Sequence, residues 1–493
     1  MSYDLPGSMP IPADIELPDK ILAGLTARQV AIIIIITAAA VITWAGFEAS
    51  RRLVPLPVLA ALAAPVAVAA AALVIGQRDG LSLDRLLIAA WRQARSPRRF
   101  VIAPGGIPAP PAWASPRLAD EVLAVADALG AGVAKALLGK ASVPDDVPYC
   151  TGSIGLLGTK PSWDMMQDAD TLLMVGSSFP YSEFLPTTGQ AKAVQIDLSP
   201  RMLSIRYPMD LALVGDAKDT LAELLPLLNR KPDRTWQDKI VGNVRDWWEL
   251  MDDAGQPSDL NGRVRPQGLF ASLSRHLPDN AILSSDSGTA ADWYARHIRI
   301  RRGMKASLSG NLATMVPGVP YGMAAKFAFS DRVAVAMVGD GAMQMGGMAE
   351  MLTAAKYYKM WADPRFVVMV LNNEDLNQVT WEQRAMEGDP RFEASQAIPY
   401  VSYADWADMI GLKGIKITRS DQIEAAFEEA FAADRPVIVD ALTTPDEPPM
   451  PPHVTFAQAR ALTKSVLADP SGGFAGAKEG VREMVQELVH RKD

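Results

Sequence analysis

RVAVAMVGDGAMQMGG, residues 332–347, contains six consecutive apolar residues that end at Gly339, Asp340 and Gly341. A second apolar run, RFVVMVLNN at 365–373, follows it and ends in two asparagines. Short apolar runs bounded by turn residues are typical of strands buried on both faces, as in a parallel sheet. The sequence therefore predicts two parallel strands whose carboxyl ends carry an aspartate and two asparagines.

Similar apolar runs occur on both sides of this stretch and are separated by segments of helix length. Parallel strands need crossover connections, which are usually helices, so this alternation predicts the α/β class. We expect two doubly wound parallel-sheet domains, at 117–230 and 266–450, joined by a connecting segment at 231–265 and followed by a helical tail at 451–493. The runs are GAGVAKAL (130–137), TLLMVGSS (171–178), KAVQID (192–197), LALVGD (211–216), AILSSD (281–286) and RPVIVDAL (435–442).

The front of the chain has a different composition. Residues 29–47 and 53–76 carry no charged side chain, and each stretch is long enough for a helix to cross a bilayer. Arginines lie between and around them, with most of the basic residues on the outer flanks. We therefore expect a two-helix transmembrane hairpin within residues 1–103, in the cytoplasmic membrane with both termini cytoplasmic. The alternative is two buried helices of a soluble protein. A proline-rich linker at 104–116 follows.

Composition excludes several functional classes. The formal charge is −8, and residues beyond 116 hold 38 basic against 49 acidic side chains. An acidic body without a basic footprint argues against nucleic acid as the main partner. Cys150 is the single cysteine, so an internal disulfide framework is excluded. The four histidines are scattered, which argues against a zinc site.

Chemistry is expected at the ends of the two central strands, where parallel sheets bind ligands. Glycines let the backbone approach a diphosphate, and the start of a helix favours negative charge. The Asp340 carboxylate and an asparagine amide oxygen are the hard ligands that Mg²⁺ prefers. Taken alone, Gly-Asp-Gly is a weak signal, because an ordinary strand-to-helix turn explains it in most chains.

Gly-Asp-Gly followed by a strand that ends in Asn-Asn resembles the signature of the thiamine diphosphate enzymes, the superfamily of pyruvate oxidase, acetolactate synthase and pyruvate decarboxylase. The resemblance covers 117–470 and fits best the pyruvate oxidase or pyruvate:quinone dehydrogenase branch, which decarboxylates a 2-oxo acid such as pyruvate. It implies the thiamine diphosphate-binding fold, thiamine diphosphate and Mg²⁺. The implied metal ligands are Asp340, Asn373 and the backbone carbonyl of Asp375.

The same resemblance implies further cofactor contacts. The Ala313 carbonyl would accept the 4′-amino group, Met315 would support the bent cofactor, and Glu382 would lie near the reacting carbon as a catalytic residue. The family usually has glycine after that methionine, whereas this chain has Val316. The implied cofactor-binding residues are Asp286, Ser287, Gly288, Thr289, Ala313, Met315, Gly339, Gly341 and Ala342.

Residues 117–230 resemble the middle domain of the family, which holds FAD in the oxidase branch. The residues that match FAD contacts are Ser177, Phe179, Asp197 and Arg201. The alternative is a purely structural domain, as in relatives that lost FAD. RRFVIAPGG at 98–106 fits the first strand of this domain and also the tail of the membrane segment.

The segment 11–113 resembles the PrgI-type small membrane proteins of actinobacterial conjugation systems, which implies a component of a secretion or DNA-transfer apparatus. The thiamine diphosphate family normally begins with a pyrimidine-binding domain, whose glutamate activates the cofactor, and no segment of this sequence resembles it. One interpretation is a membrane-tethered enzyme, homo-oligomeric through its α/β domains, that needs a pyrimidine domain in trans. The other is a membrane component with an inert enzyme-derived part.

Overall fold

The computed structural model describes residues 118–449, apart from 311–312, and a few shorter segments. The shorter segments are 20–22, 25–26, 77–78, 81–82, 100–102, 452–453, 458, 461–462 and 464–465. The chain divides into two compact units, residues 1–98 and 99–493, and the second unit contains both α/β domains.

The two predicted membrane spans, the proline-rich linker and the end of the C-terminal tail lie outside the described residues. Within the part of the chain that is described, no helix combines the length and the apolar character needed to cross a bilayer. In the first unit, two short antiparallel ladders are described. They pair β1 (Lys20–Leu22) with β2 (Leu25–Thr26) and β3 (Gln77–Arg78) with β4 (Leu81–Ser82).

The C-terminal domain is built on a six-stranded sheet in which every neighbouring pair is parallel. Its strand order is β14-β13-β15-β16-β18-β17, so the two strands with the Gly-Asp-Gly and Asn-Asn ends are central neighbours. The strands are β13 (Ile282–Ser285), β14 (Lys305–Leu308), β15 (Ala334–Gly339), β16 (Phe366–Asn372), β17 (Lys413–Ile417) and β18 (Val437–Leu442).

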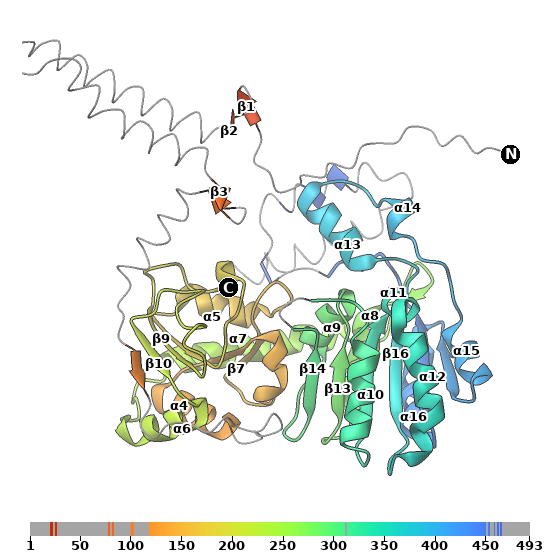
Figure 1. Ribbon diagram of the computed structural model, residues 1–493, viewed down its shortest axis with the longest axis horizontal. Helices are drawn as coiled ribbons and strands as arrows, with labels where there is room; N and C mark the ends of the chain where they lie inside the picture. The colour runs from red at the N-terminus through yellow and green to blue at the C-terminus, as the bar shows by residue number, and fades with distance from the viewer. Residues whose placement is uncertain are drawn as a thin grey trace, which may run out of the picture. The chain divides into compact units, whose positions relative to one another are not determined.

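Helices cover both faces of this sheet, as Figure 1 shows. Successive residues of a strand point to opposite faces, so every residue of the apolar run in β16 is buried, some on one face and some on the other. One core contains α8 (Pro266–His276), α9 (Thr289–His297) and α16 (Ile423–Phe431). The other contains α10 (Gly318–Ala328), α12 (Met348–Tyr357) and α15 (Tyr403–Met409).

The middle domain carries a second parallel sheet with the order β5-β10-β9-β8. Its β5 (Phe100–Ile102) pairs in parallel with β10, so RRFVIAPGG does supply a strand to this domain. The other strands are β8 (Thr171–Val175), β9 (Lys192–Asp197) and β10 (Leu211–Val214), while β6 (Val133–Lys135) and β7 (Cys150–Ser153) form a separate parallel pair. The helices are α4 (Leu118–Leu129), α5 (Lys160–Asp168) and α6 (Ala217–Leu224).

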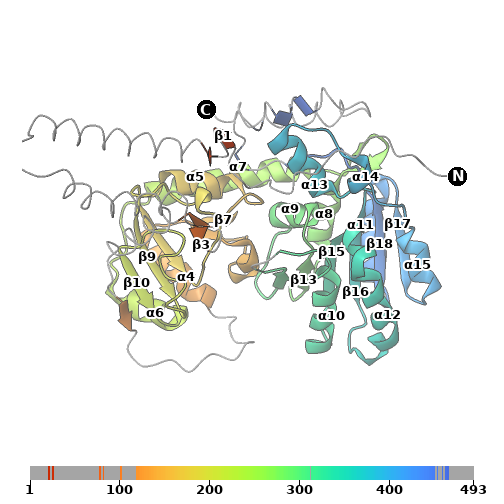
Figure 2. The same cartoon turned by 45° about the horizontal axis from the view of Figure 1, so that its top comes forward.

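A long helix, α7 (Thr235–Ala254), connects the two domains, as the helix signals in 231–265 predicted. It packs against α5 and β7 of the middle domain and reaches α8 of the C-terminal domain (Figure 2). Its Ile240 and Val244 belong to the middle-domain core. The α/β class with parallel sheets is therefore confirmed for this unit.

Candidate functional site

The Gly-Asp-Gly and Asn-Asn segments lie side by side because β15 and β16 pair in register, with Gly339 opposite Leu371. Both strands then end at the same edge of the sheet. A helical segment starts at α11 (Asp340–Ala342) and continues through one π turn into α12. In Figure 1, α11, α13 (Asn377–Glu382) and α14 (Glu393–Gln396) gather at this end of the sheet.

The Asp340 carboxylate joins the two strand ends. One oxygen accepts a hydrogen bond from the Gly341 amide at 2.8 Å. The other accepts from the backbone amides of Asn373 and Glu374, at 3.0 and 2.6 Å. The side chain is 2% exposed, and burial raises its pKa to about 7 even though these three amides lower it. A bound cation would favour the charged form of this carboxyl.

The loop after β16 is held by its own side chains. The Asn373 amide oxygen accepts from the Asp375 amide at 3.0 Å, and Glu374 between them has a φ of 60°. The Asp375 carboxylate accepts from Thr380 at 3.0 Å and from Arg391 Nε at 2.9 Å. The predicted metal ligands Asp340 and Asn373 are therefore brought together. The Asp375 side chain positions the loop and leaves its backbone carbonyl as the predicted ligand.

Asp286 fastens a second loop to the same edge. Its carboxylate accepts hydrogen bonds from the backbone amides of Ser287 and Val316, both at 2.9 Å, and from that of Gly318 at 3.0 Å. Ser287 Oγ donates to the Thr314 carbonyl. These three hydrogen bonds of the Asp286 carboxylate all hold backbone amides, and we assign it a positioning role.

The segment after residue 312 lies against the Gly-Asp-Gly turn. A Cβ placed on Gly341 would be 3.0 Å from the Met315 methyl carbon, so these two predicted cofactor residues are neighbours. Ala313 is exposed. Val316, at the position where the family has glycine, has a φ of 92°. That left-handed conformation is strained for a β-branched residue.

The remaining predicted residues of the diphosphate loop lie at the end of β13. Gly288 has a φ of 83°, which suits glycine, and it precedes α9 directly. Thr289, the first residue of α9, is buried, as is Ala342 beside the Gly-Asp-Gly turn. The loop from Asp286 to Thr289 and the turn at Gly339 therefore follow adjacent strands, β13 and β15.

Glu382 is exposed at the end of α13 and accepts a hydrogen bond from Gln378 at 2.9 Å. It lies close enough to Asp292 of α9 to raise the pKa of that buried carboxyl. Asp292 is 1% exposed, and its Oδ2 has no hydrogen-bond partner among the described residues. Burial raises the pKa of Asp292 to about 7, against the lowering effect of Arg296. Sequence reasoning missed Asp292 because nothing in its local pattern marks it.

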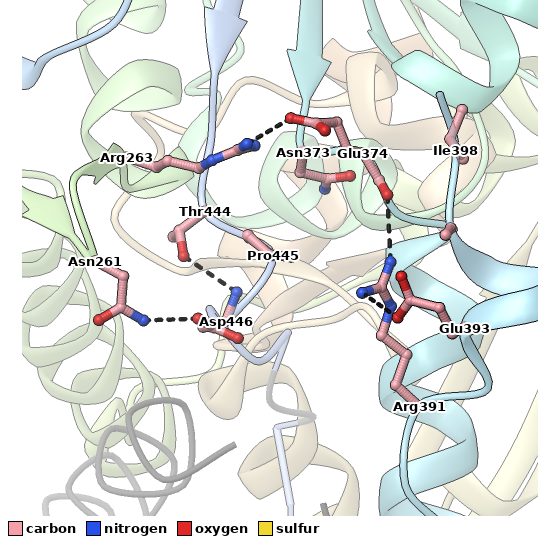
Figure 3. Close-up of a pocket in the computed structure, with 11 residues that line it drawn as sticks. Asn261, Arg263, Asn373, Glu374, Arg391, Glu393, Ile398, Thr444, Pro445 and Asp446 are labelled. Atoms are coloured by element: carbon pink, nitrogen blue, oxygen red, sulfur yellow. Dashed lines mark hydrogen bonds and ion pairs between the residues drawn. The ribbon is translucent and has the colours of Figure 1, made fainter. Parts of the chain in front are cut away.

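A cavity of about 380 Å³ adjoins the loop after β16 (Figure 3). Asn373 and Glu374 form part of its wall. Arg263 pairs with Glu374, and Arg391 pairs with Glu393 at 3.1 Å. Both arginines were missed in the sequence analysis. Arg263 lies on a hairpin strand, β12 (Arg263–Val264), about a hundred positions before Glu374 in the chain.

The residues predicted for FAD lie in the middle domain, where β8 and β9 are neighbours. Ser177 follows β8, and its carbonyl accepts from Gln195 at 3.1 Å. Asp197 ends β9 and accepts from the Ser199 amide at 2.8 Å. Phe179 is buried and Arg201 is exposed. Ser177 and Asp197 therefore share one sheet edge, while Phe179 belongs to the core of the domain.

Family comparison agrees with this arrangement. Residues 286–441 match the C-terminal TPP binding domain of thiamine pyrophosphate enzymes, and residues 110–224 match their central domain. These two domains are those of thiamine pyrophosphate enzymes. Thiamine pyrophosphate is the same molecule as thiamine diphosphate. A third match, to the PrgI family, covers residues 10–102.

Three relatives show the range of similarity. The Bacillus subtilis protein YdaP, a candidate thiamine pyrophosphate-containing protein, is 35% identical over 70% of this chain and 58% of its own length. The acetolactate synthase large subunit of Haemophilus influenzae is 26% identical over 71% of this chain and 60% of its own length. The pyruvate oxidase of Lactiplantibacillus plantarum is 24% identical over 63% and 50%. The chain thus spans 50–60% of the length of these relatives.

Proposed function

We propose that the chain binds thiamine diphosphate together with Mg²⁺ and serves 2-oxo acid decarboxylation of the kind carried out by pyruvate oxidase. The observation that supports this most is the Asp340 carboxylate, which links the ends of β15 and β16 beside Met315. An aspartate, an amide oxygen and a backbone carbonyl form a hard oxygen donor set that fits Mg²⁺.

In this proposal Asp340, Asn373 and the Asp375 carbonyl hold the metal. The amides at the start of the helical segment 340–357 face the diphosphate, together with Ser287, Gly288 and Thr289. Thiamine diphosphate supplies the nucleophilic carbon and the electron sink for decarboxylation. The chain's own residues would orient it: Met315 would support the cofactor, the Ala313 carbonyl would accept a hydrogen bond from its amino group, and Glu382 would hold a proton near the reacting carbon.

Calorimetry on the full chain in mild detergent tests the binding. We expect heat with thiamine diphosphate only when Mg²⁺ is present. Asp340→Ala should weaken the affinity at least 100-fold, and Asn373→Ala at least 10-fold. Asp253→Ala, an exposed change on α7, is the control and should leave the affinity unchanged. A wild-type chain that takes up no thiamine diphosphate with Mg²⁺ present would remove the basis of the proposal.

Turnover is proposed to depend on a pyrimidine-binding domain from a second polypeptide, because no segment of the sequence resembles one. The isolated chain should then decarboxylate pyruvate far more slowly than a complete enzyme. Adding a separate pyrimidine-binding domain should raise the rate. A wild-type rate equal to that of a complete enzyme would contradict this dependence.

FAD is proposed at Ser177, Phe179, Asp197 and Arg201, and a colourless protein that takes up no added flavin would contradict it.

The match of residues 10–102 to the PrgI family favours a second candidate function, a membrane component of a conjugation or secretion apparatus with an inert enzyme-derived part. In both cases we propose a two-pass segment with cytoplasmic termini. Cys150 is buried, so a cysteine introduced by Arg51→Cys would be the accessible thiol. Labelling of that thiol from the outer side of intact cells is expected; protection there would reject the topology.

A further inference from the structure

A groove of about 800 Å³ lies between the middle and C-terminal domains, and its lining includes none of the residues proposed for thiamine diphosphate and FAD. One wall is the side of α7 that includes Val244 and Trp248. The opposite wall is formed by the ends of α8 and α9 and by residues 299–301, and the loop at 145–148 closes one end. Its volume is within the range of small-molecule sites.

The groove has an apolar lining and a planar wall. Val241, Val244, Met251 and Ile300 supply much of the apolar surface. The guanidinium of Arg299 lies 4.3 Å from the centre of the Trp248 ring. Nucleobases and other flat heteroaromatic rings stack on indole and guanidinium planes of this kind.

His297 at the end of α9 is a buried polar group in this lining. It is 5% exposed. Among the described residues, the aromatic ring that its imidazole contacts is that of Trp293, with 6.0 Å between the two ring centres. Burial and the neighbouring arginines lower its pKa to about 3, so the imidazole stays neutral. A neutral imidazole offers one donor and one acceptor, which suit the polar edge of a heteroaromatic ring.

Four arginines line the groove, at positions 245, 275, 299 and 301, together with four carboxylates, at positions 145, 146, 249 and 252. Arg299 pairs with Asp252 at 2.7 Å and Arg275 pairs with Glu424, and both carboxylates are about half exposed or more. Exposed ion pairs contribute little free energy, so an incoming phosphate can replace these carboxylates at small cost. Guanidinium groups are well shaped for phosphate oxygens.

We propose that this groove binds a nucleoside phosphate. The base lies against the Trp248–Arg299 stack with its edge hydrogen-bonded to His297, and the phosphates lie among the arginines. Because α7, α9 and the loop at 145–148 all line the groove, the bound ligand contacts both domains and stabilises their arrangement.

Binding of ADP and GDP to the full chain in mild detergent tests this proposal, measured by calorimetry. At least one of the two should bind, and Trp248→Ala and His297→Phe should each weaken it 10-fold or more. Trp236→Ala is the matched control, because Trp236 is on the same helix, packs on the same core cluster and lies outside the groove lining. It should leave the affinity within 2-fold of wild type.

Competition separates this site from the cofactor sites. Saturating thiamine diphosphate with Mg²⁺, or saturating FAD, should leave nucleotide binding unchanged. Displacement by either cofactor would overturn the proposal, as would equal loss of binding in Trp236→Ala and Trp248→Ala. Failure of both nucleotides to bind at millimolar concentration would also overturn it. The binding of ADP or GDP and its loss in the variants can be measured whether or not the chain binds thiamine diphosphate.

Discussion

The Asp286 carboxylate accepts a hydrogen bond from the backbone amide of Val316 at 2.9 Å, and Val316 is held in a left-handed conformation with a φ of 92°. The same carboxylate accepts from Gly318 at 3.0 Å, so one side chain fixes the residues on both sides of Pro317. This pair keeps Met315 against Gly341. The strain at Val316 is therefore maintained by hydrogen bonds at the candidate site.

Val316→Gly should stabilise the protein by about 1 kcal/mol, because glycine adopts this conformation without strain. The greater conformational freedom of glycine in the unfolded chain offsets part of this gain. Urea unfolding of the two proteins checks the change. Val401→Gly is the control, because Val401 has no positive φ, and it should lower stability. An equal loss of stability in both variants would mean that Val316 is not strained.

Asp286→Ala should lower stability by about 2–4 kcal/mol, because three backbone amides near the site lose their acceptor. Asp286→Asn, which keeps one oxygen, should lose less. Both variants should also weaken thiamine diphosphate binding, since the loop that carries Met315 is released. Thermal unfolding and calorimetry measure the two effects. If Asp286→Ala is as stable as wild type, other contacts hold the loop.

Much of the fold could be predicted because central parallel strands are apolar along their whole length. The runs at 333–338 and 366–371 became β15 and β16, and the helix signals in 231–265 became α7. The strands β14 and β17 were missed. They form the two edges of the sheet and mix polar with apolar residues, as in KASL and KGIKI, so the apolar pattern is weak.

The candidate site was predicted where its residues follow a strand directly. Asp340 and Asn373 come together because adjacent parallel strands end at one edge. Residues whose role depends on tertiary contacts could not be found. Arg263 reaches Glu374 across more than a hundred residues, and the burial of Asp292 depends on the packing around α9. The hydrogen bonds that the Asp286 carboxylate accepts from the backbone amides of Val316 and Gly318, about thirty residues later, could likewise not be predicted from the sequence.

Asp292 should make stability depend on pH. Its folded pKa is raised to about 7 from an ordinary value of 3.8, so the folded state holds the proton more tightly. The resulting stabilisation is present below about pH 4 and is lost as pH rises through about 7. Asp292→Asn should therefore be more stable than wild type at pH 8, by about 2–4 kcal/mol.

At pH 4 the same two proteins should differ little, because the wild-type carboxyl is then protonated. Urea unfolding at pH 4, 6 and 8 measures the difference. Asp253→Asn, an exposed control, should show no such trend. A difference between Asp292→Asn and wild type that stays constant with pH would contradict the raised pKa of Asp292.

A buried ion network joins the two domains and should respond unequally to removal of its members. Asp145 pairs with Lys135 at 2.6 Å and with Lys140 at 3.2 Å, and all three side chains are 1% exposed. Asp145 also accepts from the Ile300 amide at 2.8 Å, and Lys140 donates to the Ala295 carbonyl at 3.1 Å. The network therefore ties the middle domain to the C-terminal domain.

Asp145→Asn should cost about 3–5 kcal/mol, because it leaves two buried ammonium groups without a counter-charge. Lys140→Met should lower stability much less, because Asp145 keeps Lys135 as its ion-pair partner. Burial already lowers the pKa of Lys140, whereas Asp145 raises the pKa of Lys135 against the effect of burial. Urea unfolding gives both values. A double variant, Asp145→Asn with Lys140→Met, should be more stable than Asp145→Asn alone, since one stranded charge is removed. A double variant that is less stable than Asp145→Asn would show that packing by Lys140 outweighs its charge.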